Sequence, residues 1–205
     1  MNQPKLPLLL DTLNHQDYAV IADFFSPEQV ACWRDDARSA LQQGLFAEAR
    51  VGAGNSLQRE ASIRRDEILW LDPAEANAAQ KSYLDFLEQL RLALNAQFML
   101  GLFAVECHYA HYQIGSFYKK HLDRHLHSRE RVVSVISYLN DNWSEDDGGE
   151  LRLYLKDGDT LDVKPQPGTL VCFFSEALPH EVLPVNRERI SLTAWLRIRS
   201  SEAIG

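Results

Sequence analysis

The sequence of 205 residues is poor in cysteine and has no long apolar run. Its three cysteines, Cys32, Cys107 and Cys172, are widely spaced and form no CxxC pair. This spacing argues against a disulfide framework and against a thiolate zinc site. No apolar run approaches the about 20 residues that span a bilayer, and the short run at 6–10 lacks the cleavage site of a signal peptide. These absences predict a soluble, cytoplasmic protein.

The sequence also lacks an excess of positive charge. It holds 21 basic and 29 acidic residues, for a formal charge of −8. A chain with this balance is not suited to holding a polyphosphate backbone, which argues against nucleic acid as a partner. The remaining composition, 45% apolar and 10% aromatic, is ordinary for a globular protein. We therefore expect a single domain, residues 1–205, with a core that needs no disulfides.

The first half of the chain has the pattern of helices with a few strands. Residues 18–21 resemble a short strand, and Ser26-Pro27 with Gln29 predicts a helix start that leads to about Gln43. Asp72-Pro73 has the same pattern and predicts a second, amphipathic helix that ends near Gly101. Between them, the glycine-containing stretch 51–56 and the segment 63–70 predict a mobile hairpin or loop.

From Phe103 onward the apolar residues alternate with period two. Turn signals such as Asp147-Gly-Gly and Pro167-Gly separate the runs. The pattern favours a β-sandwich or a jelly roll, with residues 103–199 as the core and residues 1–102 as a largely helical support. The fold class expected is thus mainly β with flanking helices (α+β). The candidate strands are 104–113, 131–139, 150–155, 160–164, 168–174, 180–183 and 190–198.

Two segments concentrate residues of metal-ligand type. His121 and Asp123 are two residues apart, so on an extended backbone their side chains point to the same face. His180 lies in a second segment, between apolar stretches. Two imidazoles and one carboxylate make the facial triad that binds Fe(II) and leaves positions open. A lone His-x-Asp is a weak signal, and its alternative is a surface histidine beside a solvated carboxylate.

The last predicted strand carries an unusual polar row. By alternation, Arg189, Ser191, Thr193 and Trp195 share one face, where a core strand would normally carry aliphatic residues. An arginine at the start of such a row is suited to a bidentate grip on a carboxylate. The alternative is a plain salt bridge at the edge of the sheet.

Together these motifs resemble the 2-oxoglutarate- and Fe(II)-dependent prolyl hydroxylases, and bacterial members of the oxygen-sensing (hypoxia-inducible-factor) subfamily in particular. The similarity covers about residues 60–198, and the fold it implies is a double-stranded β-helix (jelly roll). It includes Ile63-Arg-Arg-Asp66 and Trp70, which resemble the mobile finger segment of that subfamily. The other matching residues are Tyr112, Tyr118, His121-Leu-Asp123, Tyr138-Leu-Asn140, Gly148-Gly-Glu-Leu151, His180-Glu-Val182, Arg189 and Trp195.

The resemblance implies a role for each matching position. His121, Asp123 and His180 correspond to the iron ligands, and Arg189 with Tyr138 to the pair that holds the distal carboxylate of 2-oxoglutarate. The same correspondence makes His121, Asp123, His180 and Arg189 the catalytic set. Tyr112, Leu151 and Trp195 correspond to residues that line the 2-oxoglutarate pocket, and Arg64, Asp66 and Arg131 to positions near the peptide substrate.

The activity implied is prolyl 4-hydroxylation of a protein, which consumes 2-oxoglutarate and O₂ and gives hydroxyproline, succinate and CO₂. Fe(II) would be the metal, L-ascorbate (vitamin C) would maintain it, and elongation factor Tu is the leading candidate substrate. The alternatives are another 2-oxoglutarate oxygenase acting on a small molecule, a nucleic-acid demethylase that the acidic charge disfavours, and a non-catalytic barrel that only binds.

Overall fold

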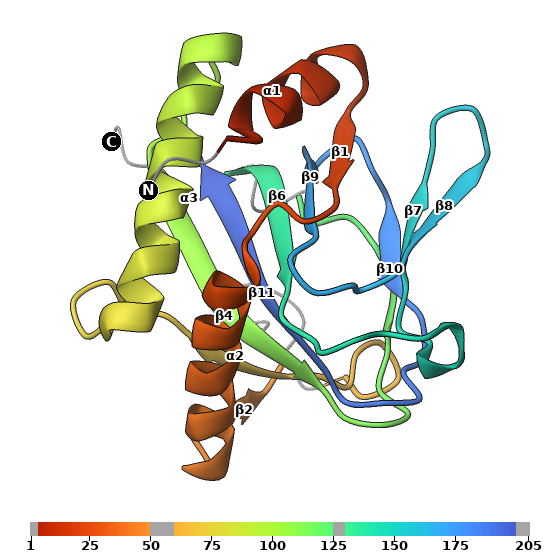
Figure 1. The fold of residues 1–205 in the computed structure, drawn as a ribbon. Helices are drawn as coiled ribbons and strands as arrows, with labels where there is room; N and C mark the ends of the chain where they lie inside the picture. Colours follow the sequence, from red (N-terminus) through yellow and green to blue (C-terminus); the bar gives the residue numbers. More distant parts are fainter. Residues whose placement is uncertain (1–3, 50–59, 125–129, 200–205) are drawn as a thin grey trace.

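A computed structural model describes residues 4–49, 60–124 and 130–199. In these ranges the chain forms three α-helices and two antiparallel sheets of seven and four strands (Figure 1). The helices are α1 (Leu6–His15), α2 (Pro27–Gln42) and α3 (Ala78–Phe98), with a 3₁₀ turn at Glu145–Asp147. The strands are β1 (Tyr18–Ile21), β2 (Ala47–Glu48), β3 (Glu67–Trp70), β4 (Ala104–Tyr112), β5 (Tyr118–His121), β6 (Arg131–Tyr138), β7 (Leu151–Tyr154), β8 (Thr160–Val163), β9 (Leu170–Phe174), β10 (His180–Val182) and β11 (Arg189–Arg197).

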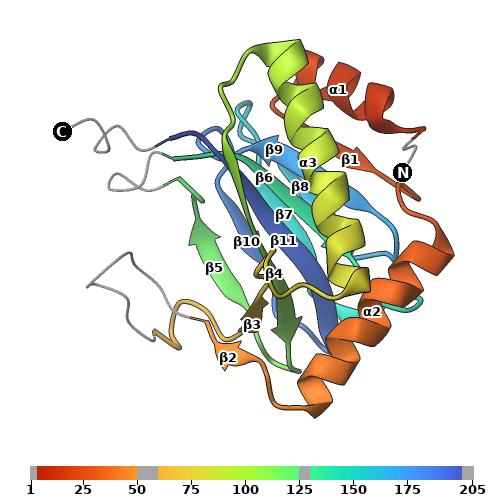
Figure 2. The ribbon, with the colours of Figure 1, turned by 90° about the vertical axis from the view of Figure 1, so that its left-hand side faces the viewer.

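The strand order identifies the architecture. The larger sheet runs β1-β9-β6-β11-β4-β3-β2, and the smaller sheet runs β5-β10-β7-β8. From β4 to β11 the chain passes repeatedly between the two sheets, and every pair within them is antiparallel. The helices lie on one side of the larger sheet, and the smaller sheet lies on the other (Figures 1 and 2). This is the double-stranded β-helix, so the expected jelly roll with flanking helices is confirmed.

All seven strands predicted after residue 103 are present, with ends that differ by one or two residues. The sequence analysis did not identify α1 or β5 as regular elements. The segment 63–70, expected to be a hairpin or loop, ends in β3, which pairs with β2 and with β4. The glycine-containing stretch 51–56 lies outside the described residues.

Both long helices begin with a capping box, but only that of α2 lies where the sequence predicted the helix start. Helix α2 has the predicted N-cap, in which Ser26 and Gln29 exchange side-chain-to-backbone hydrogen bonds. The predicted start of α3 at Asp72-Pro73 is wrong, because Asp72 instead closes a turn by accepting from the backbone N–H of Ala74 at 2.8 Å. Asn77 and Gln80 form the capping box of α3.

Contacts with α2 explain why the helix begins at this second position. The carboxylate of Asp36 accepts hydrogen bonds from Asn77 Nδ2 at 2.6 Å and from Gln80 Nε2 at 3.0 Å. It also accepts one from the hydroxyl of Tyr109 on β4, at 2.9 Å. A single carboxylate thus ties the start of α3 to α2 and to the larger sheet.

Two apolar cores keep the layers together. One lies between the helices and the larger sheet, where Phe25, Trp33, Tyr83 and Phe86 make edge-to-face or tilted ring contacts. The other lies between the two sheets and includes Tyr112, Tyr138 and Leu151. None of the helices in the described ranges is long and apolar enough to cross a membrane.

The cap assignment of α3 can be tested by stability measurements. We expect Asn77→Ala to lower the free energy of unfolding by about 1–2 kcal/mol, because it removes an N-cap and a contact to Asp36. Asp72→Ala, the control at the start that the sequence predicted, should cost less than half as much. Urea denaturation followed by circular dichroism measures both, and a larger effect of Asp72→Ala would contradict this assignment.

Candidate active site

The pairing of β5 with β10 brings two histidines together from distant parts of the chain. His180 lies directly opposite His121 in the ladder, beside an irregularity in the register. Asp123 follows β5 by two residues, and its carboxylate lies 3.6 Å from Nε2 of each histidine. One ligand atom from each of the three residues can be chosen so that all lie within 4.8 Å of one another. The structure therefore brings the predicted triad together.

The two imidazoles are fixed by the atoms behind them. Nδ1 of His121 bonds the carbonyl of Lys119 at 2.7 Å, and Nδ1 of His180 bonds the carbonyl of Leu178 at 3.0 Å. Because Nδ1 of each ring donates to a carbonyl, Nε2 is the nitrogen that each ring directs toward Asp123. The ring of Tyr118 stacks on His121 with centroids 3.6 Å apart. Both ring orientations are thus set without any ligand.

Asp123 is held by a pair of buried hydroxyls. Ser134 on β6 donates to Oδ2 of Asp123 at 2.6 Å, and Ser175 lies 2.8 Å from the Ser134 hydroxyl. Burial opposes ionisation of Asp123, but His180, His121 and Ser134 together hold the pKa of its carboxyl well below its usual value. Burial also lowers the pKa of His180 to about 4, so that its imidazole is neutral at pH 7.

This donor set fits Fe(II). Two neutral imidazole nitrogens and one carboxylate are the ligands of a facial iron site, and each has the outer partner that such ligands need. In the described part of the chain, no fourth His, Cys, Asp or Glu joins the cluster. A metal held by these three residues would keep positions free for a co-substrate and for O₂.

Arg189 is a buried cation with no counter-ion in the described part of the chain. It is 1% exposed, and its guanidinium lies 4.9 Å from the ring of Tyr112 and 5.0 Å from that of Tyr138. Its one hydrogen bond within the described ranges is a long one, 3.4 Å, to Ser191, and it forms no ion pair there. The Nε of Arg189 and the hydroxyl of Tyr138 are buried with no hydrogen-bond partner among those residues. A carboxylate ligand would satisfy both groups and supply the missing charge.

The surroundings of Arg189 are apolar side chains and a closely packed glycine turn. Leu151 on β7 belongs to the same apolar cluster as Tyr112 and Tyr138. Gly149 has a φ of +69°, and a Cβ there would lie 3.3 Å from Cδ of Arg189 and 2.6 Å from Val185. Glycine is therefore required at this position both for its backbone conformation and for the space beside the guanidinium.

Trp195 lies at the opposite end of the polar row from Arg189. The two Cα atoms are six residues apart on β11, about 20 Å along an extended strand. The guanidinium of Arg131 lies 3.5 Å from the centre of the Trp195 ring and pairs with Glu106 at 3.0 Å. Glu106 also pairs with Arg197. The structure thus groups Trp195 with Arg131 and not with Arg189.

Arg64 and Asp66 form a bidentate ion pair. Nε and Nη2 of Arg64 donate to the Asp66 carboxylate at 2.7 and 2.5 Å. Asp66 is buried, and Arg64 lies 4.3 Å above the ring of Tyr118. Backbone hydrogen bonds also join this segment to β5, as the N–H of Lys119 donates to Ile63. Asp66 is therefore placed to orient Arg64 rather than to meet a ligand itself.

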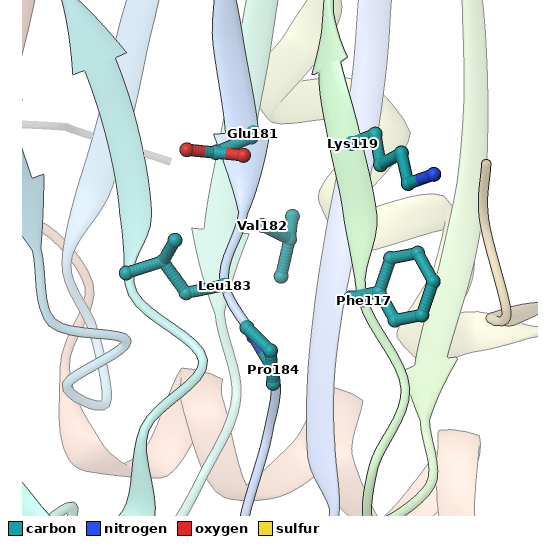
Figure 3. Close-up of a pocket in the computed structure, with 6 residues that line it drawn as sticks. All are labelled: Phe117, Lys119, Glu181, Val182, Leu183 and Pro184. Atoms are coloured by element: carbon teal, nitrogen blue, oxygen red, sulfur yellow. The ribbon is translucent and has the colours of Figure 1, made fainter. Parts of the chain in front are cut away.

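A separate hollow of about 290 Å³ lies along β5 and β10 (Figure 3). It contains none of the residues that the sequence analysis assigned to the site. Its lining is mostly apolar, with one basic and one acidic side chain. The residues are Phe117, Lys119, Glu181, Val182, Leu183 and Pro184.

Comparison with known proteins agrees with this geometry. The model of the 2OG-Fe(II) oxygenase superfamily matches residues 107–197. The crystal structure of a Pseudomonas putida prolyl-4-hydroxylase is 40% identical, with a TM-score of 0.85 over 95% of this chain and 100% of that one. The chain belongs to the 2-oxoglutarate- and Fe(II)-dependent prolyl hydroxylases.

Two further relatives belong to the oxygen-sensing branch. A Trichoplax adhaerens prolyl hydroxylase, solved with a hypoxia-inducible-factor peptide, has a TM-score of 0.86 at 25% identity over 95% of this chain and 90% of that one. A Caenorhabditis elegans hypoxia-inducible factor prolyl hydroxylase is 27% identical over 94% of this chain. This chain spans 28% of the length of the C. elegans protein. The resemblance expected from the sequence is confirmed.

Several residues of this prolyl hydroxylase site were not identified from the sequence. Ser134 was unremarkable in a predicted strand, and only the fold places its hydroxyl against Asp123. Tyr118 was among the residues that match the prolyl hydroxylases, but no role was assigned to it. His108 lay in the predicted strand 104–113 with no role assigned. Ser134 offered no local signal.

The role of Ser134 can be tested against a neighbour on the same strand. We expect Ser134→Ala to weaken metal binding by about tenfold or more, because it removes the hydrogen bond that orients Asp123. Ser137→Ala is the matched control, since Ser137 is also buried on β6 but bonds Tyr83 on the helix side. Anaerobic titration with Fe(II) or Mn(II) measures both, and equal affinities would contradict the assignment.

Proposed function

We propose that this chain catalyses 2-oxoglutarate- and O₂-dependent 4-hydroxylation of a prolyl residue in a protein. The observation that carries the proposal is the buried guanidinium of Arg189, which has no ion-pair partner among the described residues. Arg189 begins the row on β11 whose other end, Trp195, is paired with Ser134, the residue that bonds Asp123. The products would be hydroxyproline, succinate and CO₂. A barrel that only binds, or a structural metal site, would have no need of a second, unpaired anion receptor.

The chain's own residues would hold and orient the reactants. His121, Asp123 and His180 would bind Fe(II), and Arg189 with Tyr138 would hold the distal carboxylate of 2-oxoglutarate. Bound iron and 2-oxoglutarate would supply the oxidising chemistry when O₂ is present. Tyr112 and Leu151 would keep water from the co-substrate. We also expect L-ascorbate to sustain turnover by keeping the iron reduced.

A protein substrate is supported by the charged and aromatic groups at the Trp195 end. Arg131 covers the Trp195 ring, Arg64 lies over Tyr118, and Trp70 is 50% exposed beside them. Such a surface suits an exposed peptide segment better than a compact metabolite. The hypoxia-inducible-factor peptide bound by the Trichoplax protein supports the same class of substrate. Elongation factor Tu is our leading candidate.

The deciding experiment is mass spectrometry of treated proteins. Purified elongation factor Tu and a bacterial lysate are each incubated with the enzyme, Fe(II), 2-oxoglutarate and ascorbate. We expect one prolyl residue to gain the mass of one oxygen atom, with matching formation of succinate. Asp123→Ala, which removes the only anionic member of the triad, should abolish the modification. Succinate formation without any hydroxyproline would favour a small-molecule oxygenase.

The co-substrate grip predicts the effect of changing Arg189. Arg189→Ala removes a charge-assisted contact, so the KM for 2-oxoglutarate should rise at least about tenfold. Metal affinity should be retained, because Arg189 does not contact the triad in the described structure. Steady-state succinate assays and metal titration test the two parts. An unchanged KM would make Arg189 a structural residue only.

The ion pair near Tyr118 predicts a selective effect on the protein substrate. Changing both Arg64→Ala and Asp66→Ala removes the cation over Tyr118 and the carboxylate that orients it. We expect the ratio of protein hydroxylation to substrate-free 2-oxoglutarate consumption to fall about tenfold or more. Asp66→Asn, which keeps a hydrogen-bond acceptor, should have a smaller effect. Equal loss of both activities would point to a general structural role.

A further inference from the structure

His108 is a buried histidine whose ring is not fully satisfied. It is 2% exposed, and its Nδ1 has no hydrogen-bond partner in the part of the chain that the structure describes. His111, three residues later on the same strand, is also buried, but its Nδ1 bonds Glu67 at 3.1 Å. An unpaired buried nitrogen is a cost that folded proteins rarely carry without a reason.

The strand register places His108 on the face that carries the site. Its cross-strand neighbours are Thr193 on β11 and Trp70 on β3. One step further along the same face, Trp195 is paired with Ser134, the residue that bonds Asp123. The imidazole stacks on the Trp195 ring with centroids 5.2 Å apart, and the half-exposed Trp70 ring lies 4.8 Å away. His108 thus contacts both Trp195, whose strand neighbour bonds Asp123, and Trp70, which is half exposed.

Several of the groups around His108 are hydrogen-bond donors. The indole N–H of Trp195 is buried and, within the described ranges, also unpartnered. Burial and the cations of Arg64 and Arg131 outweigh the carboxylate of Asp123 and lower the pKa of His108 to about 3, so its ring is neutral. The nearby carboxylate of Glu106 is already engaged by Arg131 and Arg197. A peptide entering here would meet several donors for its carbonyls, and His108 is the neutral group free to accept from its N–H.

We propose that Nδ1 of His108 accepts a hydrogen bond from a main-chain N–H of the substrate segment and so helps to select a peptide over other substrates. The indole N–H of Trp195 can donate to a carbonyl of the same segment. This inference rests on the proposed function and names a substrate-binding residue that the sequence did not indicate. The free energy cost of the unpaired nitrogen is recovered only when a substrate is bound.

The test combines kinetics with thermal stability. We expect His108→Leu to raise the KM for the protein substrate about fivefold or more with a much smaller change in kcat, because the bond is made equally in the ground and transition states. His108→Asn places a polar atom near the position of Nδ1 and should restore the KM to within about twofold of wild type. His108→Gln places its polar atoms near the position of Nε2 instead and should not restore the KM. Elongation factor Tu, or the prolyl protein that wild type modifies in the lysate, is the probe.

Thermal stability distinguishes a role of His108 in substrate recognition from a role in packing the protein core. His108→Leu removes an unsatisfied nitrogen, so its Tm should equal or exceed that of wild type. His111→Leu, the matched control on β4, should lower the Tm, because it gives up the bond to Glu67, and should leave the KM for the protein unchanged.

Three results would overturn the inference. They are an unchanged KM in His108→Leu, the same KM in His108→Leu and His108→Asn, and a loss of Tm in His108→Leu as large as in His111→Leu. If the wild-type enzyme hydroxylates no prolyl residue at all, the proposed function fails and the inference fails with it. That outcome is distinguishable, because it is seen before any variant is made.

Discussion

Strand β11 carries apolar side chains on one face and polar or aromatic side chains on the other, and the candidate site depends on this alternation. Ile190, Leu192, Ala194 and Leu196 face the helices in one apolar core, while the row from Arg189 to Trp195 faces the smaller sheet. A slip of one residue would bury the guanidinium among aliphatic side chains and turn leucines toward the site. Pairing with β4 along its whole length and with β6 along most of it makes that slip costly.

The face toward the smaller sheet carries most of the unsatisfied polar atoms of the described structure. Of the six buried side-chain nitrogens or oxygens that lack a partner among the described residues, five lie on β11 or on the strands beside it, and the sixth belongs to Arg34 on α2. Each such atom costs about 1–3 kcal/mol. The helix-side core, with its cluster of aromatic rings, is well placed to offset this cost. Stability and ligand binding thus depend on opposite faces of the same sheet.

How much the sequence predicts depends on how local the cause is. Period-two alternation identified seven strands, and the His-x-Asp spacing identified two members of the triad, because each pattern is set by neighbours in one segment. The start of α3 was misjudged because Asn77 is chosen through contacts with Asp36 on another helix. The contact of Ser134 with Asp123 and the pairing of Arg64 with Asp66 could not be predicted from the sequence either. Both depend on which side chains the fold brings together.

In the proposed function the two ends of the polar row have different roles, one in holding the co-substrate and the other in contacting the protein substrate. At one end Arg189 lies beside the rings of Tyr112 and Tyr138 and the glycine turn next to Val185. At the other end Trp195 and His108 lead to Trp70, which is half exposed. Ser134, which bonds the carboxylate of Asp123, is the cross-strand neighbour of Trp195. The residues proposed to contact a protein do not touch Arg189. We therefore expect substitutions in β3, β4 and the segment before β3 to change the preferred protein substrate without changing 2-oxoglutarate binding.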